Sequence, residues 1–306
     1  MNARLITTED AEWPEHLSEL GSHRVPESLH VCGRSLPDPS MSIAIVGTRR
    51  PTVTGLELAR NMAAAFCQSG YAVVSGLAVG IDAAAHRGAL DAKGHTVAVL
   101  GCGLNVPYPV KNGRLRASIK EAGTMVTEYD FDTPPFSGNF PERNRIIVGL
   151  SCAVVVIEGG LRSGAMITAK AALDADRAVY AVPGSPRNPV AIAPNELIRT
   201  GQAGLVTSAQ HVFDDLAPGL VWTDPYQPSR RAPELPEEEL GVLHSLESVP
   251  ATMDQVCAAT GSAPGLVALI LSKLEVRGLV RQTSSGSYEI TETGSRISAV
   301  TVGRNV

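Results

Sequence analysis

Four apolar residues run directly into a glycine turn in the stretch Ile43-Ala44-Ile45-Val46-Gly47-Thr48-Arg49-Arg50. A short run that is apolar throughout is typical of a strand covered on both faces of a parallel sheet. Similar runs recur up to residue 182, and helical stretches with glycine turns separate them. This alternation predicts an α/β fold in which a Rossmann-like parallel sheet is flanked by helices.

The predicted elements of this region follow the chain in alternation. The strands are Ile43–Val46, Ala72–Val74, Thr96–Leu100, Met125–Thr127, Ala153–Ile157 and Ala178–Val182. The helices are Gly55–Gln68, Ile81–Ala92, Lys111–Glu121, Glu142–Leu150 and Ala165–Asp174.

The rest of the chain divides around this domain, which we expect to span residues 42–216. Residues 1–41 form a short N-terminal lead-in segment, and residues 217–236 hold five prolines, which is typical of an extended linker. Residues 237–306 are expected to form a small winged-helix domain. Its predicted elements are the helices Glu237–Leu246, Met253–Ala259 and Gly265–Val276 and the strands Leu279–Gln282 and Tyr288–Ile290.

Charge and cysteine usage narrow the class of protein. The net charge of −5 argues against a generally basic nucleic-acid-binding surface, but residues 43–217 hold 16 Lys and Arg against 14 Asp and Glu. Residues 234–306 hold 5 Lys and Arg against 9 Asp and Glu, so we expect any polyanion site to be a local cluster in the central region.

The five cysteines are widely spread without a CxxC pair, and neither a signal peptide nor an apolar run of membrane-spanning length is found. We therefore expect a cytoplasmic protein without a membrane span.

Glycine-rich loops follow four of the predicted strands: Gly47-Thr48-Arg49-Arg50, Ser75–Gly80, Gly101-Cys102-Gly103 and Glu158–Gly164. In an open parallel sheet, ligands bind at the carboxyl ends of the strands, where such loops expose backbone N–H groups to anions. Any single loop is explained equally well by a turn requirement, but four at one edge favour a phosphate site. None matches GxGxxG or the Walker A pattern, so no nucleotide cofactor is predicted. No metal-ligand spacing is present either.

A second informative segment runs from Phe136 to Ile147. Pro141 suits the start of a helix, which places Phe140 just outside it. Arg143 and Arg145 then lie in the first turns, where the helix dipole disfavours cations, so an anion is expected to offset them. That anion is either a phosphate or a carboxylate of Glu142, Glu158 or Asp130. Arginine beside an aromatic residue also suits stacking on unpaired bases.

Five further residues invite an acid–base or nucleophilic interpretation. Asp82 and His86 stand four residues apart, a spacing that helix pairing and capping by Asp82 explain without catalysis. Ser163, like Ser75, precedes a glycine but is not in a GxSxG motif, so its hydroxyl is expected to cap a helix or bind phosphate. Glu158 ends a buried strand, where it could orient Arg49 or Arg143 or act on a nucleotide ribose.

Taken together, these motifs resemble the DNA-processing protein A (DprA/Smf) family. The resemblance rests on Ile45–Arg49, Ser75–Ala78, Gly80–Asp82, Ala85–Leu90, Tyr108-Pro109, Phe140–Ile147, Ser163–Ala169 and Ala181–Gly184. It implies a non-catalytic protein that binds single-stranded DNA, forms a homodimer and helps to load a RecA-type recombinase in natural transformation or related DNA processing. It also implies that the DNA-binding residues are Gly47, Thr48, Arg49, Gly76, Phe140, Arg143, Asn144, Arg145, Ser163 and Gly164.

An enzyme is the alternative hypothesis. Nucleotide N-glycosidases of the phosphoribohydrolase type share a related fold with Gly-Gly loops, arginine and glutamate. In that interpretation Glu158 acts on the ribose and Arg143 holds the 5′-phosphate. A proline-rich linker and a winged helix have no evident use in such an enzyme, which favours the DNA-binding hypothesis.

Overall fold

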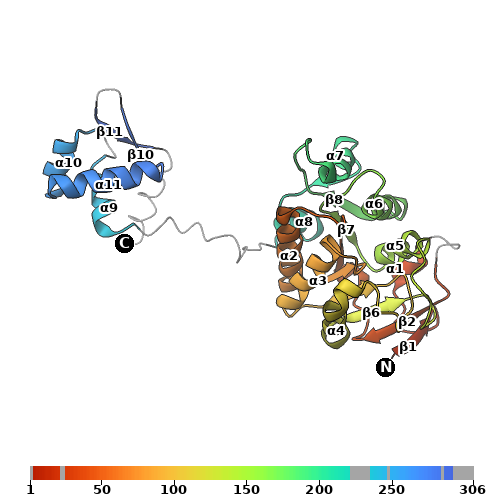
Figure 1. Cartoon of the computed structure of the whole chain (residues 1–306). Helices are drawn as coiled ribbons and strands as arrows, with labels where there is room; N and C mark the ends of the chain where they lie inside the picture. The colour runs from red at the N-terminus through yellow and green to blue at the C-terminus, as the bar shows by residue number, and fades with distance from the viewer. Residues whose placement is uncertain (1–2, 21–24, 221–234, 247–248, 284–285, 292–306) are drawn as a thin grey trace. The chain divides into compact units, whose positions relative to one another are not determined.

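The computed structural model describes residues 3–20, 25–220, 235–246, 249–283 and 286–291. The chain divides into two compact units, Met1–Asp224 and Pro225–Val306 (Figure 1). Most of the expected linker, residues 221–234, lies outside the described residues.

The larger unit is built on a nine-stranded sheet with the order β1-β2-β6-β5-β4-β3-β7-β8-β9. Strands β3 to β9 pair with one another in parallel, whereas β2 runs antiparallel to both β1 and β6. The strands are β1 (Ala3–Thr7), β2 (Ser28–Gly33), β3 (Ser42–Val46), β4 (Ala72–Ser75), β5 (Thr96–Val99), β6 (Thr124–Thr127), β7 (Ala153–Val156), β8 (Ala178–Ala181) and β9 (Gly204–Leu205). The parallel α/β class is thus confirmed, and each predicted strand is present within one residue at either end.

Hydrophobic clusters cover both faces of this sheet. Side chains alternate along a strand, so Ile43 and Ile45 of β3 contribute to one core, and Ala44 and Val46 to the other. One face is covered by α2 (Val53–Gln68), α3 (Ile81–Asp91), α4 (Gly113–Ala122) and α8 (Ala209–Leu216). The other is covered by α1 (Glu15–Ser18), α5 (Asn139–Gly149), α6 (Gly164–Asp174) and α7 (Ile192–Arg199), as Figure 1 shows. This double covering explains why the central strands are apolar throughout.

The N-terminal lead-in is part of the same sheet and not a separate appendage. Strand β2 pairs with β6, from His30↔Thr127 to Gly33↔Thr124, and β1 adds one more antiparallel strand beyond it. Leu17 and Leu29, both fully buried, anchor the segment in the core.

Two helices differ from their predicted form. The predicted helix Lys111–Glu121 is a short 3₁₀ turn, η2 (Val110–Asn112), followed by α4 (Gly113–Ala122). Helix α5 begins at Asn139, so Phe140 lies in its first turn and not just outside the helix. Helices α7 and α8 and strand β9 were not predicted.

The smaller unit has the predicted winged-helix composition. Its elements are α9 (Glu237–His244), α10 (Met253–Thr260), α11 (Pro264–Val276), β10 (Val280–Gln282) and β11 (Tyr288–Ile290), which enclose one apolar core. Thr252 and Gln255 form a capping box that fixes the start of α10. Helix α11 exposes Leu266, Leu269 and Val276, so its outer face is largely apolar.

Candidate functional site

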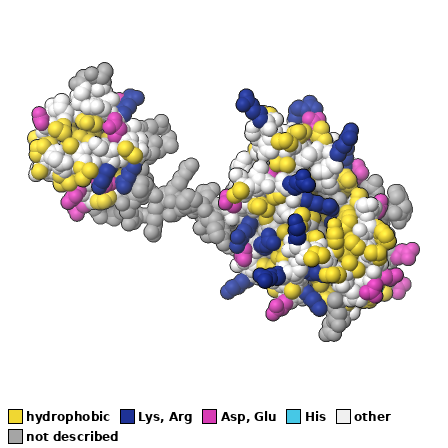
Figure 2. Space-filling view, in the orientation of Figure 1, with side chains coloured by type: hydrophobic (Ala, Val, Ile, Leu, Met, Phe, Trp, Pro, Cys, Tyr) yellow, Lys and Arg dark blue, Asp and Glu magenta, His cyan; other side chains and the backbone are white. Residues whose placement is uncertain are grey.

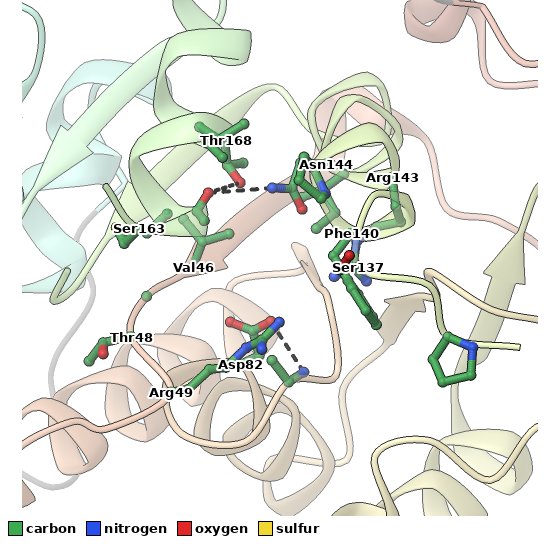
Figure 3. Close-up of a pocket in the computed structure, with 18 of the residues that line it drawn as sticks. Val46, Thr48, Arg49, Asp82, Ser137, Phe140, Arg143, Asn144, Ser163 and Thr168 are labelled. Carbon is green, nitrogen blue, oxygen red and sulfur yellow. Dashed lines mark hydrogen bonds between the residues drawn. The ribbon is translucent and has the colours of Figure 1, made fainter. Parts of the chain in front are cut away.

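An open cavity of about 650 Å³ lies at the carboxyl end of the sheet. Strand β3 has β4 on one side and β7 on the other, so the chain changes direction across the sheet at β3. Such a switch point is where open α/β sheets bind ligands. We call this cavity the loop pocket. Its walls are Val46, Gly47, Thr48, Arg49, Arg50, Ala78, Asp82, Tyr108, Pro135, Ser137, Phe140, Pro141, Arg143, Asn144, Ile147, Ser163, Gly164, Ala165, Ile167 and Thr168 (Figure 3).

The N-terminus of α6 forms one wall of the loop pocket. Ser163 caps the helix by accepting a hydrogen bond from the Met166 N–H at 3.3 Å. The carbonyl of Gly164 accepts from Asn144 Nδ2 at 3.4 Å and from Thr168 Oγ1 at 3.0 Å, and Figure 3 shows these groups meeting across the pocket. The exposed first turn of an α-helix attracts anions through its N–H groups and its dipole.

The loop after β3 forms the opposite wall and is held rigidly. The Thr48 N–H donates to the Glu158 carbonyl at 2.7 Å, and the Thr48 carbonyl accepts from the Ile81 N–H at 3.2 Å. A side chain at Gly47 would collide with Ile81, so this position requires glycine. The loop thereby presents Arg49 and Arg50, both exposed, and neither forms an ion pair with another described residue.

Phe140 provides an aromatic surface beside these arginines. Its ring centroid lies 5.6 Å from Arg49 Cζ and 5.4 Å from the Tyr108 ring centroid. The ring also packs against Gly101, where an added Cβ would lie 2.8 Å from Phe140 Cδ1. A guanidinium over a half-exposed ring is an arrangement that accepts both a phosphate and a stacked base.

Arg143 is buried, with only 4% of its surface exposed, although it lines the pocket. Its Nη1 donates to the Gly76 carbonyl at 2.9 Å and to the Val99 carbonyl, so it ties α5 to the ends of β4 and β5. Burial lowers the pKa of the guanidinium to about 10, an effect that Asp82 opposes. The structure therefore engages Arg143 with backbone carbonyls, and its contact with DNA stays a prediction.

Asp82 faces Arg143 from the first turn of α3. Its carboxylate accepts hydrogen bonds from the N–H groups of Gly76 at 3.1 Å and Ala78 at 3.3 Å. Burial raises the pKa of this carboxyl, and the charge of Arg143 opposes the shift. The expected pairing of Asp82 with His86 is not observed, because His86 Nδ1 lies 2.7 Å from Thr96 Oγ1 instead. Asp82 thus organises the loop between β4 and α3.

Arg145 lies on the other side of α5 and does not line the loop pocket. Its two terminal nitrogens contact the two carboxylate oxygens of Glu128 at 2.9 and 2.6 Å. The carboxylate alternative considered for this arginine is therefore the one observed, although Glu128 was not among the candidate acids.

Glu158 also points away from the pocket. Its carboxylate accepts from Thr52 N–H at 2.9 Å and Thr52 Oγ1 at 2.6 Å, so it fastens the N-cap of α2. The side chain contacts neither Arg49 nor Arg143 through any hydrogen bond or ion pair in the described structure. The expectation that Glu158 orients one of these arginines is therefore wrong.

The structure gathers most of the predicted site residues and adds others. Gly47, Thr48, Arg49, Phe140, Arg143, Asn144, Ser163 and Gly164 line the loop pocket, while Gly76 lines an adjoining hollow of about 80 Å³. Arg50, Tyr108 and Thr168 also line the loop pocket, although the sequence analysis gave them no role there. Tyr108 could have been found from its place after the glycine turn that ends β5. Among the described residues, no group of His, Cys, Asp and Glu could hold a metal ion.

The described helices differ from membrane spans in length or composition when each is taken singly. No single one of them is long and apolar enough to cross a membrane, although the bent pair α10 and α11 passes together by length and composition.

The sequence matches two family models and several known proteins. A family model described as DNA recombination-mediator protein A matches residues 4–217, and the DprA winged helix domain matches residues 227–286. Protein Smf of Escherichia coli (strain K12) is 36% identical over 292 residues, which cover 93% of this chain and 77% of that protein. DNA processing protein DprA of Bacillus subtilis (strain 168) is 40% identical over 185 residues, which cover 60% of this chain and 62% of that protein.

Two solved structures resemble the chain closely enough to compare. DNA processing protein A from Streptococcus pneumoniae has a TM-score of 0.65 at 35% sequence identity. The match covers 70% of this chain and 75% of the Streptococcus pneumoniae chain. DNA processing protein A from Helicobacter pylori, solved in a study of its single-stranded DNA binding mode, has a TM-score of 0.64 at 28% sequence identity. The match covers 71% of this chain and 96% of the Helicobacter pylori chain. The sequence motifs, the parallel sheet and these matches agree, and the chain belongs to the DprA/Smf family of DNA-processing proteins.

Proposed function

We propose that this chain is a non-catalytic, cytoplasmic mediator that binds single-stranded DNA in the loop pocket and helps to load a RecA-type recombinase. The observation that carries the proposal is the stacking of Arg49 on Phe140, 5.6 Å from guanidinium carbon to ring centroid, at the mouth of a 650 Å³ cavity. A duplex hides the faces of its bases, so an aromatic platform of this kind favours an unpaired strand.

The phosphates of such a strand have two places to bind. The N-terminus of α6 at Ser163 and Gly164 offers backbone N–H groups, and the β3 loop offers Arg49 and Arg50. Between them stands Phe140 for a base. The pocket therefore matches the alternating chemistry of a single strand, with phosphates on charged groups and bases on rings. The Helicobacter pylori relative, studied for its single-stranded DNA binding, supports the same ligand class.

Filter binding tests the ligand class. Labelled single-stranded and double-stranded DNA of the same length and sequence are titrated with the full chain at several salt concentrations. We expect tighter binding of the single strand, little sequence preference, and an affinity that falls linearly on a log–log plot against salt. Equal affinity for duplex and single strand would contradict the proposal.

The recombinase and homodimer parts of the proposal rest on family membership. They are tested by adding the chain to single-stranded DNA already covered by a single-strand-binding protein, and then measuring the DNA-dependent ATPase of a RecA-type recombinase. We expect a shorter lag before ATP hydrolysis, and a mass of two chains by light scattering. An unchanged lag removes the loading role while leaving DNA binding intact.

The enzyme alternative finds no support in the position of Glu158. Both of its oxygens are engaged by Thr52, and its side chain does not line the loop pocket. A glycosidase needs a carboxylate directed at the sugar within hydrogen-bonding reach. Asp82 lines the pocket, but its carboxylate is bound by the N–H groups of Gly76 and Ala78.

A further inference from the structure

A second concave surface lies on the flank of the larger unit, between α3 and the segment that runs from η2 into α4. It is an open groove of about 850 Å³, which we call the α3–α4 groove. Its charged and hydroxyl side chains are Arg87, Asp91, Lys111, Arg114, Ser118 and Glu121. None of these residues was among the predicted DNA-binding positions.

The charge of the α3–α4 groove is positive. Arg87, Lys111 and Arg114 are exposed, and none of them forms an ion pair with a residue in the described ranges. Of the two acids, Asp91 is already engaged by Arg60 at 2.7 Å. Three cations therefore face one uncommitted carboxylate, Glu121, and Figure 2 shows Lys and Arg side chains gathered over this region of the larger unit.

Helix α4 adds to this positive potential. Its first turn contains Arg114 and Arg116 and no acidic residue, although the helix dipole disfavours cations there. Arg116 is engaged in the interior, where its Nη2 donates to the Leu104 carbonyl at 2.6 Å. Arg114 has no such partner for its guanidinium among the described residues and lines the groove. An anion in the groove would offset both the dipole and the clustered cations.

Consecutive residues of the chain line the loop pocket and the α3–α4 groove. The hollow of about 80 Å³ beside the loop pocket is lined by Arg49, Tyr108, Pro109 and Phe140. Tyr108 and Phe140 are shared with the loop pocket, and the residues after Pro109, Val110 and Lys111, line the α3–α4 groove. The segment Tyr108–Lys111 therefore contributes residues to the loop pocket, to the adjoining hollow and to the α3–α4 groove.

We infer that the α3–α4 groove is a second phosphate-binding subsite, which holds the continuation of the same single strand after it passes Tyr108. The groove offers cations and no exposed aromatic ring, so it binds the backbone without stacking the bases. This inference rests on the proposed function of the loop pocket, and it assigns a longer binding footprint than that pocket alone can give.

A length series of oligothymidylates tests the inference. Fluorescence anisotropy is measured with the full chain and labelled strands from about 4 to about 16 nucleotides, the range that single-strand sites commonly occupy. The variant Arg87→Ala/Arg114→Ala removes two groove cations and leaves Lys111 beside Pro109 unchanged. Both side chains are exposed, so folding is not expected to suffer. The matched control is Lys120→Ala/Arg199→Ala, which removes two exposed cations outside both sites.

For the wild type we expect affinity to increase in a step once the strand is long enough to reach the groove. In Arg87→Ala/Arg114→Ala this step disappears, so long strands bind roughly tenfold more weakly at low salt while the shortest strands bind as before. The slope of log affinity against log salt for long strands decreases by about 1.4, which is the loss of two phosphate contacts to a single strand. The control variant retains both the step and the slope.

Three results would overturn the inference. If the short strands bind the wild type but the groove variant keeps the full affinity for long strands, the groove is not part of the footprint and the loop-pocket proposal stands. If the control variant loses as much affinity as the groove variant, the effect is one of net charge. Absence of binding at every length contradicts the proposed function itself.

Discussion

Arg49 Cζ lies 5.6 Å from the centroid of the Phe140 ring, although 91 positions of sequence separate the two residues. Arg49 comes from the loop after β3 and Phe140 from the first turn of α5, so the pair joins two walls of the loop pocket (Figure 3). This contact joins the group proposed to bind phosphate to the ring proposed to stack on a base, and the DNA-binding proposal depends on it.

Replacing either partner should weaken single-strand binding without unfolding the chain. We expect Arg49→Ala and Phe140→Ala each to cost about 1–3 kcal/mol of binding free energy, because one removes a phosphate partner and the other a stacking platform. Fluorescence anisotropy with a short oligothymidylate measures both. Arg49→Ala should also lower the salt slope, whereas Phe140→Ala should leave it unchanged.

Arg145→Ala is the matched control for this pair. It removes an arginine from the same helix as Phe140, but the side chain is paired with Glu128 outside the loop pocket. We expect the affinity of Arg145→Ala to lie close to that of the wild type. A loss equal to that of Arg49→Ala would show that the strand runs along the opposite side of α5.

We expect Arg143→Ala to lower the stability of the fold more than it lowers DNA affinity. The guanidinium is buried and donates to the carbonyls of Gly76 and Val99, and its loss also removes a positive charge that favours the ionised form of Asp82. We expect the free energy of unfolding to fall by about 3 kcal/mol or more, as measured by urea denaturation of the larger unit. Unchanged stability with abolished DNA binding would make Arg143 a direct contact instead.

Stability should decrease as the pH falls, in part because of His86. Burial lowers the pKa of His86 to about 3, whereas an unfolded histidine titrates near pH 6.5. Between these values the unfolded chain binds the extra proton, so stability is present above pH 6.5 and is progressively lost toward pH 3.

Urea denaturation at pH 7 and pH 5 measures this effect. At pH 5 the cost from His86 is about 2 kcal/mol. The variant His86→Asn keeps a donor near Thr96 Oγ1, 2.7 Å from Nδ1 in the structure, and should lose less stability between the two pH values than the wild type. An equal or larger loss in the variant would exclude His86 as a source of the pH dependence.

Glu158→Gln separates the binding hypothesis from the enzyme hypothesis. We expect no release of free base from nucleoside monophosphates by the wild type, and unchanged single-strand affinity in the variant. The expected cost is instead about 1 kcal/mol of stability, because the amide weakens the contact with Thr52 at the N-cap of α2. Base release by the wild type that Glu158→Gln abolishes would establish catalysis.

Much of this fold could be predicted because its central strands are covered on both faces. Runs such as Ala153–Val156 are apolar throughout and leave little choice of element or position. Strand β1 gave no such signal, because it lies at the edge of the sheet and Leu5 remains 54% exposed. The sequence therefore predicted a lead-in segment but not that its strands extend the sheet.

The site was predicted in position more accurately than in chemistry. Glycine turns after parallel strands must meet at one edge, and Gly47 and Ser163 both line the loop pocket there, together with Phe140 from the first turn of α5. The partners of Arg143, Arg145 and Glu158 could not be predicted, because they lie 67, 17 and 106 residues away in sequence. An arginine early in a helix indicates a missing anion or acceptor, but whether a phosphate, a carbonyl or a carboxylate supplies it depends on the tertiary fold.

Photo-crosslinking shows directly whether bases of a bound strand lie on the rings of the loop pocket. An oligothymidylate that carries 5-iodouracil in place of thymine is bound to the full chain and irradiated, and the crosslinked peptide is identified by mass spectrometry. DNA binding in the loop pocket predicts a crosslink on Phe140 or Tyr108, whose ring centroids lie 5.4 Å apart. Crosslinks confined to the winged-helix unit, residues 235–291, with none on either ring, would contradict it.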